Sequence, residues 1–327
     1  MQIRQTFHQQ QAVNRRNSLL LVAIVTVLLA ALGFAIGYGT TGYVEGAFGV
    51  TTFAIILAML LSVGSYFAGD KLVLAASGAR AIDEKVSPQL MNVVRELTIA
   101  AGIPMPKVYV IDDTAPNAFA TGRDPKHASI AITTGLLQKL DREELQGVVA
   151  HELAHIRNFD IRFSLLVAVL VGSIALLSDF FLRFTFWGGG RRGGGSRDRG
   201  GGGLVAIMFI IAIVLAIIAP IISRLVQLAV SRQREYLADA SSVELTRNPR
   251  GIERALAKIS SDREVLEVAN RATQHLYFTN PIKKFEGRSS SLFSTHPGIV
   301  DRVNRLRQLT GEPPLMESDV RALAGLD

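Results

Sequence analysis

The chain has 327 residues and a formal net charge of +7, and 49% of its residues are hydrophobic. It contains no cysteine, which excludes disulfide bonds and thiolate metal ligands, so any zinc site must use histidine and carboxylate side chains. The hydrophobic residues gather in a few long blocks, which excludes an ordinary soluble protein. We interpret the positive charge as basic residues flanking membrane segments, and we expect no nucleic-acid partner.

Residues 1–70 are predicted to form an N-terminal transmembrane hairpin. No charged residue interrupts the stretch from Leu19 to Ile36, and a second apolar stretch runs from about Ala47 to Ala68. The short link between them carries one charged residue, Glu45. Lysine and arginine lie beyond the other ends of both stretches, so the positive-inside rule puts the N-terminus and the chain after the hairpin in the cytoplasm.

Residues 71–162 are predicted to form the first part of a soluble domain. Ser87 and Pro88 are typical of a helix start, and Gly102 is typical of its end. Three runs typical of β-strands follow, at Lys107–Asp112, Asn117–Thr121 and Ala128–Thr133. A turn-rich link joins the last two runs, which predicts a small antiparallel sheet.

The sequence His151-Glu-Leu-Ala-His155 lies near the far end of the next predicted helix, which Asp141 caps. Residues four apart on a helix project from the same face, so the two imidazoles can bind one zinc ion while Glu152 lies beside it. The pattern predicts a metal site with a general base next to it. Alternatively, two packed histidines could flank a salt-bridged glutamate, but a buried glutamate without a cation is costly.

Residues 163–222 are predicted to form a second hydrophobic hairpin, within which residues 188–203 are a flexible loop rich in glycine and arginine. The four arginines of this loop conflict with the positive-inside rule if both apolar stretches cross the bilayer. A shallow hairpin that does not cross would remove the conflict. In both cases residues 223–327 return to the side of the first part and complete the domain, with helices expected from Asn248 and over Val300–Leu309.

A catalytic zinc ion usually has three protein ligands and an open fourth position. A third histidine in the same segment is excluded, because position 161 is isoleucine. The best candidate is Glu235 on a later helix, since Asp239 lies one helical turn further on and could accept a hydrogen bond from a ligand histidine. Glu244 and Glu253 are weaker candidates without such a partner in helical register.

Several further motifs accompany the histidine pair. They are Pro116-Asn-Ala-Phe-Ala-Thr-Gly122, Thr134-Gly-Leu-Leu137, Glu235 to Asp239, Ser294-Thr-His-Pro297 followed by Arg302, and two pairs of apolar spans. Together with the histidine motif, these resemble the HtpX family of membrane-integral zinc metalloproteases, relatives of the prenyl-protein (CAAX) endopeptidases. Ala154, where many members have glycine, lies outside the metal-facing positions.

The resemblance implies a fold that is mainly α with a small antiparallel β-sheet. It also implies an integral membrane protein with four apolar segments, a cytoplasmic gluzincin-type metalloprotease domain and one Zn²⁺ per chain. In the expected mechanism, zinc held by His151, His155 and Glu235 lowers the pKa of its bound water, and Glu152 takes that water's proton. The resemblance makes His296 the candidate donor to the oxyanion.

The residues Asn117, Ala118, Phe119 and Ala120 are expected to form an edge strand with a free side. Such a strand would bind the substrate backbone by strand addition and so accept many sequences, although an ordinary sheet strand is an open alternative. Broad acceptance suits degradation better than processing at one site.

We therefore expect a multi-pass endopeptidase of the bacterial cytoplasmic (inner) membrane, with its active site facing the cytoplasm. Its partners would be the lipid bilayer and misfolded, damaged or unfolded membrane proteins; the sequence does not predict an oligomeric state. One alternative is a dedicated processing protease of specific membrane or prenylated substrates. Another is a non-catalytic, zinc-stabilised membrane scaffold, against which Glu152 argues because a structural zinc site needs no base.

Overall fold

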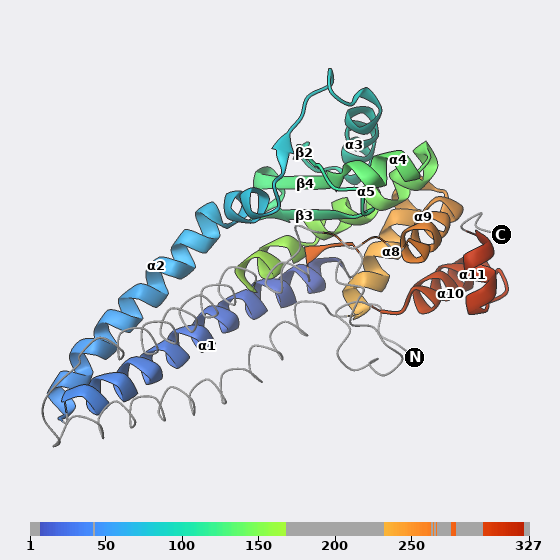
Figure 1. Ribbon diagram of the computed structural model, residues 1–327. Coiled ribbons are helices and arrows are strands. Elements are labelled where there is room, and N and C mark those ends of the chain that lie inside the picture. Colours follow the sequence, from blue (N-terminus) through green and yellow to red (C-terminus); the bar gives the residue numbers. More distant parts are fainter. Residues whose placement is uncertain are drawn as a thin grey trace, which may run out of the picture.

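A computed structural model describes residues 7–41, 43–167, 232–262, 264, 266, 276–278 and 297–323. The first two helices, α1 (Phe7–Thr41) and α2 (Val44–Ala76), form an antiparallel hairpin that extends away from the sheet and the C-terminal helices (Figure 1). The start of α1 and the end of α2 both lie at the side of the folded domain. The predicted hairpin is therefore present as a pair of packed helices.

Helix α2 has the length and composition of a membrane span, and within the described residues it is the one helix that has both. A shorter apolar helical stretch, Arg16–Ala31, lies in α1. The second predicted hairpin falls almost wholly outside the described residues, so the expected total of four apolar segments stays a prediction. The division at residues 70, 162 and 222 likewise stays a prediction.

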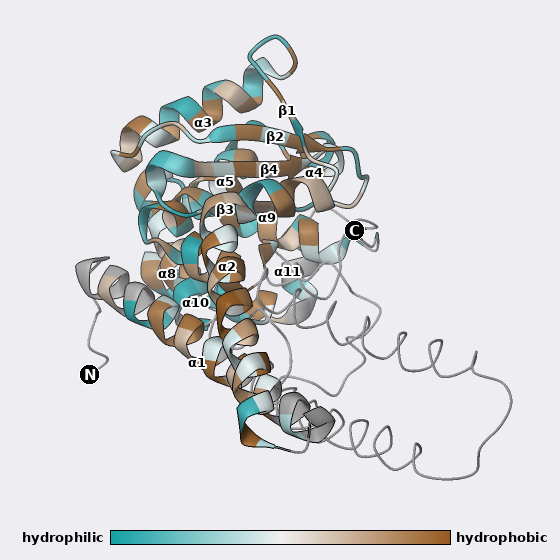
Figure 2. Cartoon of the chain, turned by 90° about the vertical axis from the view of Figure 1, so that its left-hand side faces the viewer, coloured by the Kyte–Doolittle hydropathy of each residue, from teal (hydrophilic) through white to brown (hydrophobic). Residues whose placement is uncertain are grey.

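Helix α2 consists largely of hydrophobic residues (Figure 2), and many of its large apolar side chains are exposed. The exposed ones are Val44, Phe48, Phe53, Ile56, Met59, Leu60, Val63, Phe67 and Leu72. A contiguous apolar surface of this kind is unfavourable in water and typical of contact with lipid or a partner. Helix α2 packs closely against α1 at Gly33. A Cβ atom at this position would lie 2.8 Å from the Ala54 Cβ atom, so the contact requires glycine.

The sheet has four strands, β1 (Arg80–Ala81), β2 (Lys107–Ile111), β3 (Ala118–Gly122) and β4 (Ala128–Thr133), in the order β1-β2-β4-β3. Strands β3 and β4 are antiparallel, as predicted. Strands β2 and β4 are parallel, so the expectation of a wholly antiparallel sheet is wrong. The reason is that β4 lies between β2 and β3, and the two reversals before and after β3 return the chain to the direction of β2.

Three helices adjoin these strands in the sequence: one lies between β1 and β2, and two come after β4. Helix α3 (Pro88–Ala101) has the predicted bounds, with Gly102 in the left-handed conformation at its end. Helix α4 (Thr134–Lys139), which the sequence did not predict, begins where the Thr133 hydroxyl accepts a hydrogen bond from the Leu136 amide. Helix α5 (Arg142–Arg157) begins with a capping box between Asp141 and Glu144 and carries the histidine pair.

The C-terminal helices are α8 (Arg232–Thr246), α9 (Pro249–Ser261), α10 (Ile299–Thr310) and α11 (Glu317–Leu323). Helices α8 and α9 pack on α5, which is thereby enclosed by α3, α8, α9 and β3 (Figure 1). Gly147 allows this contact, because a Cβ atom there would lie 2.7 Å from the backbone nitrogen of Ile252. The Ser242 hydroxyl also donates to the Gly147 carbonyl at 2.7 Å. The chain before residue 168 and the C-terminal helices thus pack together at α5, the helix that carries the histidine pair and is called the metal helix below.

Candidate metal centre

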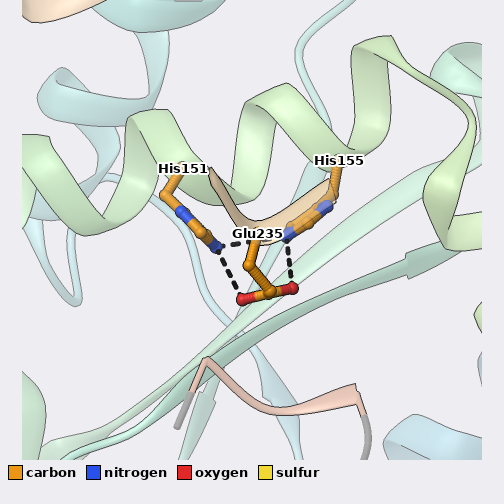
Figure 3. A group of neighbouring side chains, drawn as sticks. All are labelled: His151, His155 and Glu235. Atoms are coloured by element: carbon orange, nitrogen blue, oxygen red, sulfur yellow. Dashed lines mark hydrogen bonds and ion pairs between the residues drawn. The ribbon is translucent and has the colours of Figure 1, made fainter. Parts of the chain in front are cut away.

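The side chains of His151, His155 and Glu235 point toward one another across the contact between α5 and α8 (Figure 3). The two Nε2 atoms lie 3.1 Å apart. The Glu235 carboxylate oxygens lie 3.7 Å from Nε2 of His151 and 3.6 Å from Nε2 of His155. The structure thus brings together the three residues that the sequence predicted as one site.

These separations fit a single metal ion. Tetrahedral ligands that lie about 2.0–2.2 Å from zinc are about 3.3–3.6 Å from one another. The separations of 3.1, 3.6 and 3.7 Å lie close to that range, with Oε2 of Glu235 nearer to His151 and Oε1 nearer to His155, so both carboxylate oxygens face the metal position. Two imidazoles and one carboxylate are also the donor set of known catalytic zinc sites, so these residues could hold zinc and leave one position open.

A carboxylate and a buried arginine lie behind His151. Its Nδ1–H donates to Oδ1 of Asp239 at 2.9 Å, which leaves Nε2 free to bind a metal. Arg302, whose side chain is fully buried, donates to both Asp239 oxygens, at 2.6 and 2.8 Å. Burial and the charges of His155 and Arg302 lower the pKa of His151 to about 4, so its imidazole is neutral near pH 7 and ready to bind a metal.

A similar arrangement lies behind His155. Its Nδ1 atom is 3.0 Å from Oδ2 of Asp160, and the buried Arg234 lies 3.8 Å from the other Asp160 oxygen. Burial alone would lower the pKa of His155, but the bond to Asp160 and the charge of Glu235 outweigh it and raise the pKa to about 9. Without a metal this charged bond stabilises the fold below about pH 6.5, and the stabilisation is lost as the pH rises through about 9.

Glu152 is buried beside the three candidate ligands. Burial and the negative charge of Glu235 raise its pKa to about 7, although His155 and a hydrogen bond from the Ala120 amide oppose the shift. A carboxylate with a pKa near 7 can accept a proton and release it again under ordinary conditions. This is the property that a general base in a hydrolytic site requires.

The other residues that the sequence suggested for this site lie in different places. Glu244 is exposed on α8, and Glu253 pairs with Arg307 at 3.5 Å, so neither belongs to the cluster. Asp239 lies where the sequence argument expected it, against a histidine of the pair. His296 lies outside the described residues, and its role stays a prediction.

The edge of β3 that the sequence expected to be free is partly covered, and a substrate-binding role for Asn117, Ala118, Phe119 and Ala120 stays a prediction. Asn117 and Phe119 pair with β4, while the Phe278 amide donates to the Ala118 carbonyl at 2.7 Å. Tyr277 forms a bridge with Phe119, and its ring lies 5.1 Å from the Phe119 ring. The Ala120 amide donates to the Glu152 side chain, so this backbone group on the same edge is also engaged.

Sequence reasoning missed Asp160, Arg234 and the role of Arg302. Asp160 follows His155 by five residues, which is not a helical spacing for a shared face. The contact forms because the chain turns at Phe159, whose φ of 59° lies in the left-handed region. Arg302 stood in a recognised motif, but only the fold shows that it contacts Asp239 across 63 positions of sequence.

Comparison with known proteins agrees with this geometry. Residues 84–310, which include the metal helix and α8, match the description "Peptidase family M48". The chain belongs to peptidase family M48. This M48 chain is therefore a membrane zinc metalloprotease, as the resemblance predicted.

Two M48 relatives illustrate the extent of the likeness. A "Protease HtpX homolog" from Caldanaerobacter subterraneus subsp. tengcongensis is 43% identical over 94% of this chain and 99% of the relative. One from Streptococcus thermophilus (strain CNRZ 1066) is 45% identical over 92% of this chain and 99% of the relative. The crystal structure of S. mikatae Ste24p is 17% identical with a TM-score of 0.47, covering 91% of this chain and 66% of that one.

Proposed function

We propose that this M48 protein is an endopeptidase of the bacterial cytoplasmic membrane that cleaves misfolded or damaged membrane proteins on the cytoplasmic side. The observation that carries the proposal is a buried glutamate, Glu152, next to three side chains spaced for one zinc ion. A purely structural zinc site would not require a buried carboxylate at that position.

In this proposal His151, His155 and Glu235 are the zinc ligands. Zinc bound there would polarise the peptide carbonyl and make water a stronger nucleophile. Asp239 and Asp160 keep protons on the Nδ1 atoms of the two histidines, so that both Nε2 atoms face the metal position. The surrounding burial keeps this orientation fixed.

Glu152 serves as the general base and then as the general acid. Its carboxylate accepts a proton from the attacking water and delivers that proton to the nitrogen of the leaving amine. In the metal-free site burial raises the pKa of Glu152 to about 7, which makes its carboxylate a stronger base than an exposed glutamate. We keep His296 as the proposed donor to the oxyanion, on the strength of the family motif alone.

The substrate is proposed to pair with β3 from Ala120 toward Gly122. The Phe278 amide donates to the Ala118 carbonyl and the Ala120 amide donates to Glu152, so we propose that a substrate strand pairs beyond these groups, at the end of β3 near Glu152. Backbone pairing of this kind depends little on the substrate's side chains, so it supports the degradation of varied sequences. This placement favours quality control over the alternative of a dedicated processing enzyme.

The membrane orientation rests on the α1–α2 hairpin. The start of α1 and the end of α2 lie at the side of the folded domain, so a crossing hairpin would leave the metal centre on the side of the N-terminus (Figure 1). Arg15 and Arg16 at the start of α1 and Lys71 at the end of α2 support a cytoplasmic location for that side.

The catalytic proposal can be tested with the purified, zinc-loaded protein and an unfolded model substrate. Glu152→Gln should abolish cleavage while one zinc ion per chain is retained, because the change removes the base and no ligand. Glu244→Gln, which alters an exposed glutamate of α8, is the matched control and should cleave normally. Retained cleavage by Glu152→Gln would refute the assigned base.

The orientation can be tested by cysteine labelling, because the chain has no cysteine of its own. Glu45→Cys and Lys85→Cys place single thiols at exposed positions beyond the two ends of the apolar part of α2. In sealed vesicles an impermeant maleimide should reach the two positions from opposite sides, with residue 85 on the cytoplasmic side. Labelling of both positions from one side would refute a crossing hairpin.

A further inference from the structure

A cluster of arginine and aromatic side chains lies where α2 meets the chain segments after β3 and after α5. The guanidinium carbons of Arg123 and Arg162 each lie 5.9 Å from the centre of the Tyr66 ring. Arg123 also lies 5.3 Å from the Phe67 ring, and Arg162 lies 5.0 Å from the Phe159 ring. All four separations fall in the range of favourable cation–π contacts.

The two arginines are held in a fixed relation. The Arg162 Nε–H donates to the backbone carbonyl of Arg123 at 2.7 Å. Phe159 reaches Arg162 from a left-handed backbone conformation, with φ of 59°, which is rare for an aromatic residue and is maintained only where the surroundings stabilise it. The cluster is thus a built arrangement that keeps two like charges close together.

The positive charge of the cluster is only partly compensated. Asp124 lies 3.7 Å from the Arg123 Nε atom, and in the part of the chain that the structure describes no carboxylate pairs with Arg162. The aromatic rings lie against the two guanidinium groups, and apart from the Arg162 Nε–H that donates to the Arg123 carbonyl, the N–H groups of a guanidinium can bind a further acceptor. A phosphate group suits such paired, planar donors and would supply the missing negative charge.

The position of the cluster along α2 indicates where this phosphate would come from, provided that α2 crosses the membrane as proposed above. From Val44 to Tyr66 the helix rises about 33 Å, close to the roughly 30 Å thickness of a bilayer's hydrocarbon core. Tyr43 is exposed at one end of this stretch, and Tyr66 and Phe67 lie at the other. Aromatic residues at both ends are typical of the two membrane interfaces, so the cluster lies at the level of lipid headgroups.

We propose that Arg123 and Arg162 form a binding site for the phosphate of an anionic phospholipid at the cytoplasmic end of α2. The bound headgroup holds the end of β3 at the membrane surface. Arg123 directly follows the last residue of β3, so the edge from Ala120 to Gly122 lies beside the bilayer. Substrate segments that emerge from the membrane would then arrive beside this end of β3, close to Glu152.

The test uses the full-length, zinc-loaded protein, freed of lipid in a neutral detergent, with phosphatidylglycerol as the probe and native mass spectrometry as the measurement. The double variant Arg123→Gln/Arg162→Gln should bind phosphatidylglycerol about 30-fold more weakly, since each basic residue at an anionic surface contributes about fivefold. Arg95→Gln/Arg142→Gln removes two charges from arginines that pair with Glu84 and Glu96, and serves as the charge-matched control. Equal weakening in both variants would overturn the site.

Two further measurements keep the result interpretable. Inorganic phosphate should not displace the lipid; displacement at equal concentration would show a free-anion site and overturn the lipid assignment. A photoreactive phosphatidylglycerol should label the wild-type protein near residues 66, 123 and 159, and labelling only elsewhere would also overturn it. Normal lipid binding by the double variant together with normal cleavage would refute this site and leave the proposed function intact.

Discussion

The buried pair formed by Arg302 and Asp239 offers the most quantitative test of how the metal centre is stabilised. Arg302→Met keeps most of the side-chain volume but leaves the Asp239 carboxylate buried, with the His151 Nδ1–H as its remaining strong donor. Breaking one partner of a buried ion pair costs about 3–5 kcal/mol. At about 2–4 °C per kcal/mol for domains of 150–250 residues, the melting temperature should fall by about 6–20 °C.

The assay is thermal unfolding of the zinc-loaded protein in detergent, with Arg142→Met as the control. Arg142 forms an ion pair with Glu96 on the surface, with about half of each side chain exposed, so its loss should cost less than about 1 kcal/mol. Adding Asp239→Asn to Arg302→Met should recover part of the loss, because no unpaired charge then remains buried. The reasoning is refuted if Arg302→Met destabilises the protein no more than Arg142→Met does.

Three further predictions concern the same centre. Asp160→Asn should weaken zinc binding by about 10–100-fold in a chelator competition, because Asp160 fixes the proton of His155; unchanged affinity would contradict this role. Zinc affinity should increase with pH up to about pH 9, since zinc must displace a proton from His155, and a flat profile at neutral pH would argue against the shifted pKa. Gly147→Ala should separate α5 from α9 and lower the melting temperature, whereas an unchanged value would show that the contact can relax.

The parts of the fold that could be predicted are those that local chemistry determines. Ser87, Pro88 and Gly102 mark the ends of α3 because a helix end needs particular residues at particular positions. Asp141 marks the start of α5 in the same way. The histidine pair could be placed on one face of α5 because helical spacing alone determines it.

The parts that could not be predicted depend on contacts between distant segments. The parallel pairing of β2 with β4 cannot be predicted from the sequence of either strand, because that sequence does not determine which strand lies beside it. The segment at Tyr277 and Phe278 carries no strand pattern, yet it covers part of the β3 edge. Arg302 meets Asp239 only after α10 has packed beside α8.

The third ligand was predicted by a different kind of argument. Glu235 was inferred from the requirement that a catalytic zinc ion has three protein ligands, and from Asp239 one turn further along the helix. Its position next to both histidines agrees with that requirement. A chemical requirement can thus connect residues that sequence periodicity cannot.

The most direct test of the account is the location of the metal itself, by anomalous X-ray scattering at the zinc edge from crystals of the zinc-loaded protein. The account predicts one peak per chain, about 2.0–2.2 Å from the Nε2 atoms of His151 and His155 and from a Glu235 carboxylate oxygen. A peak without Glu235 in contact, or a peak at another cluster of side chains, would contradict the proposed centre.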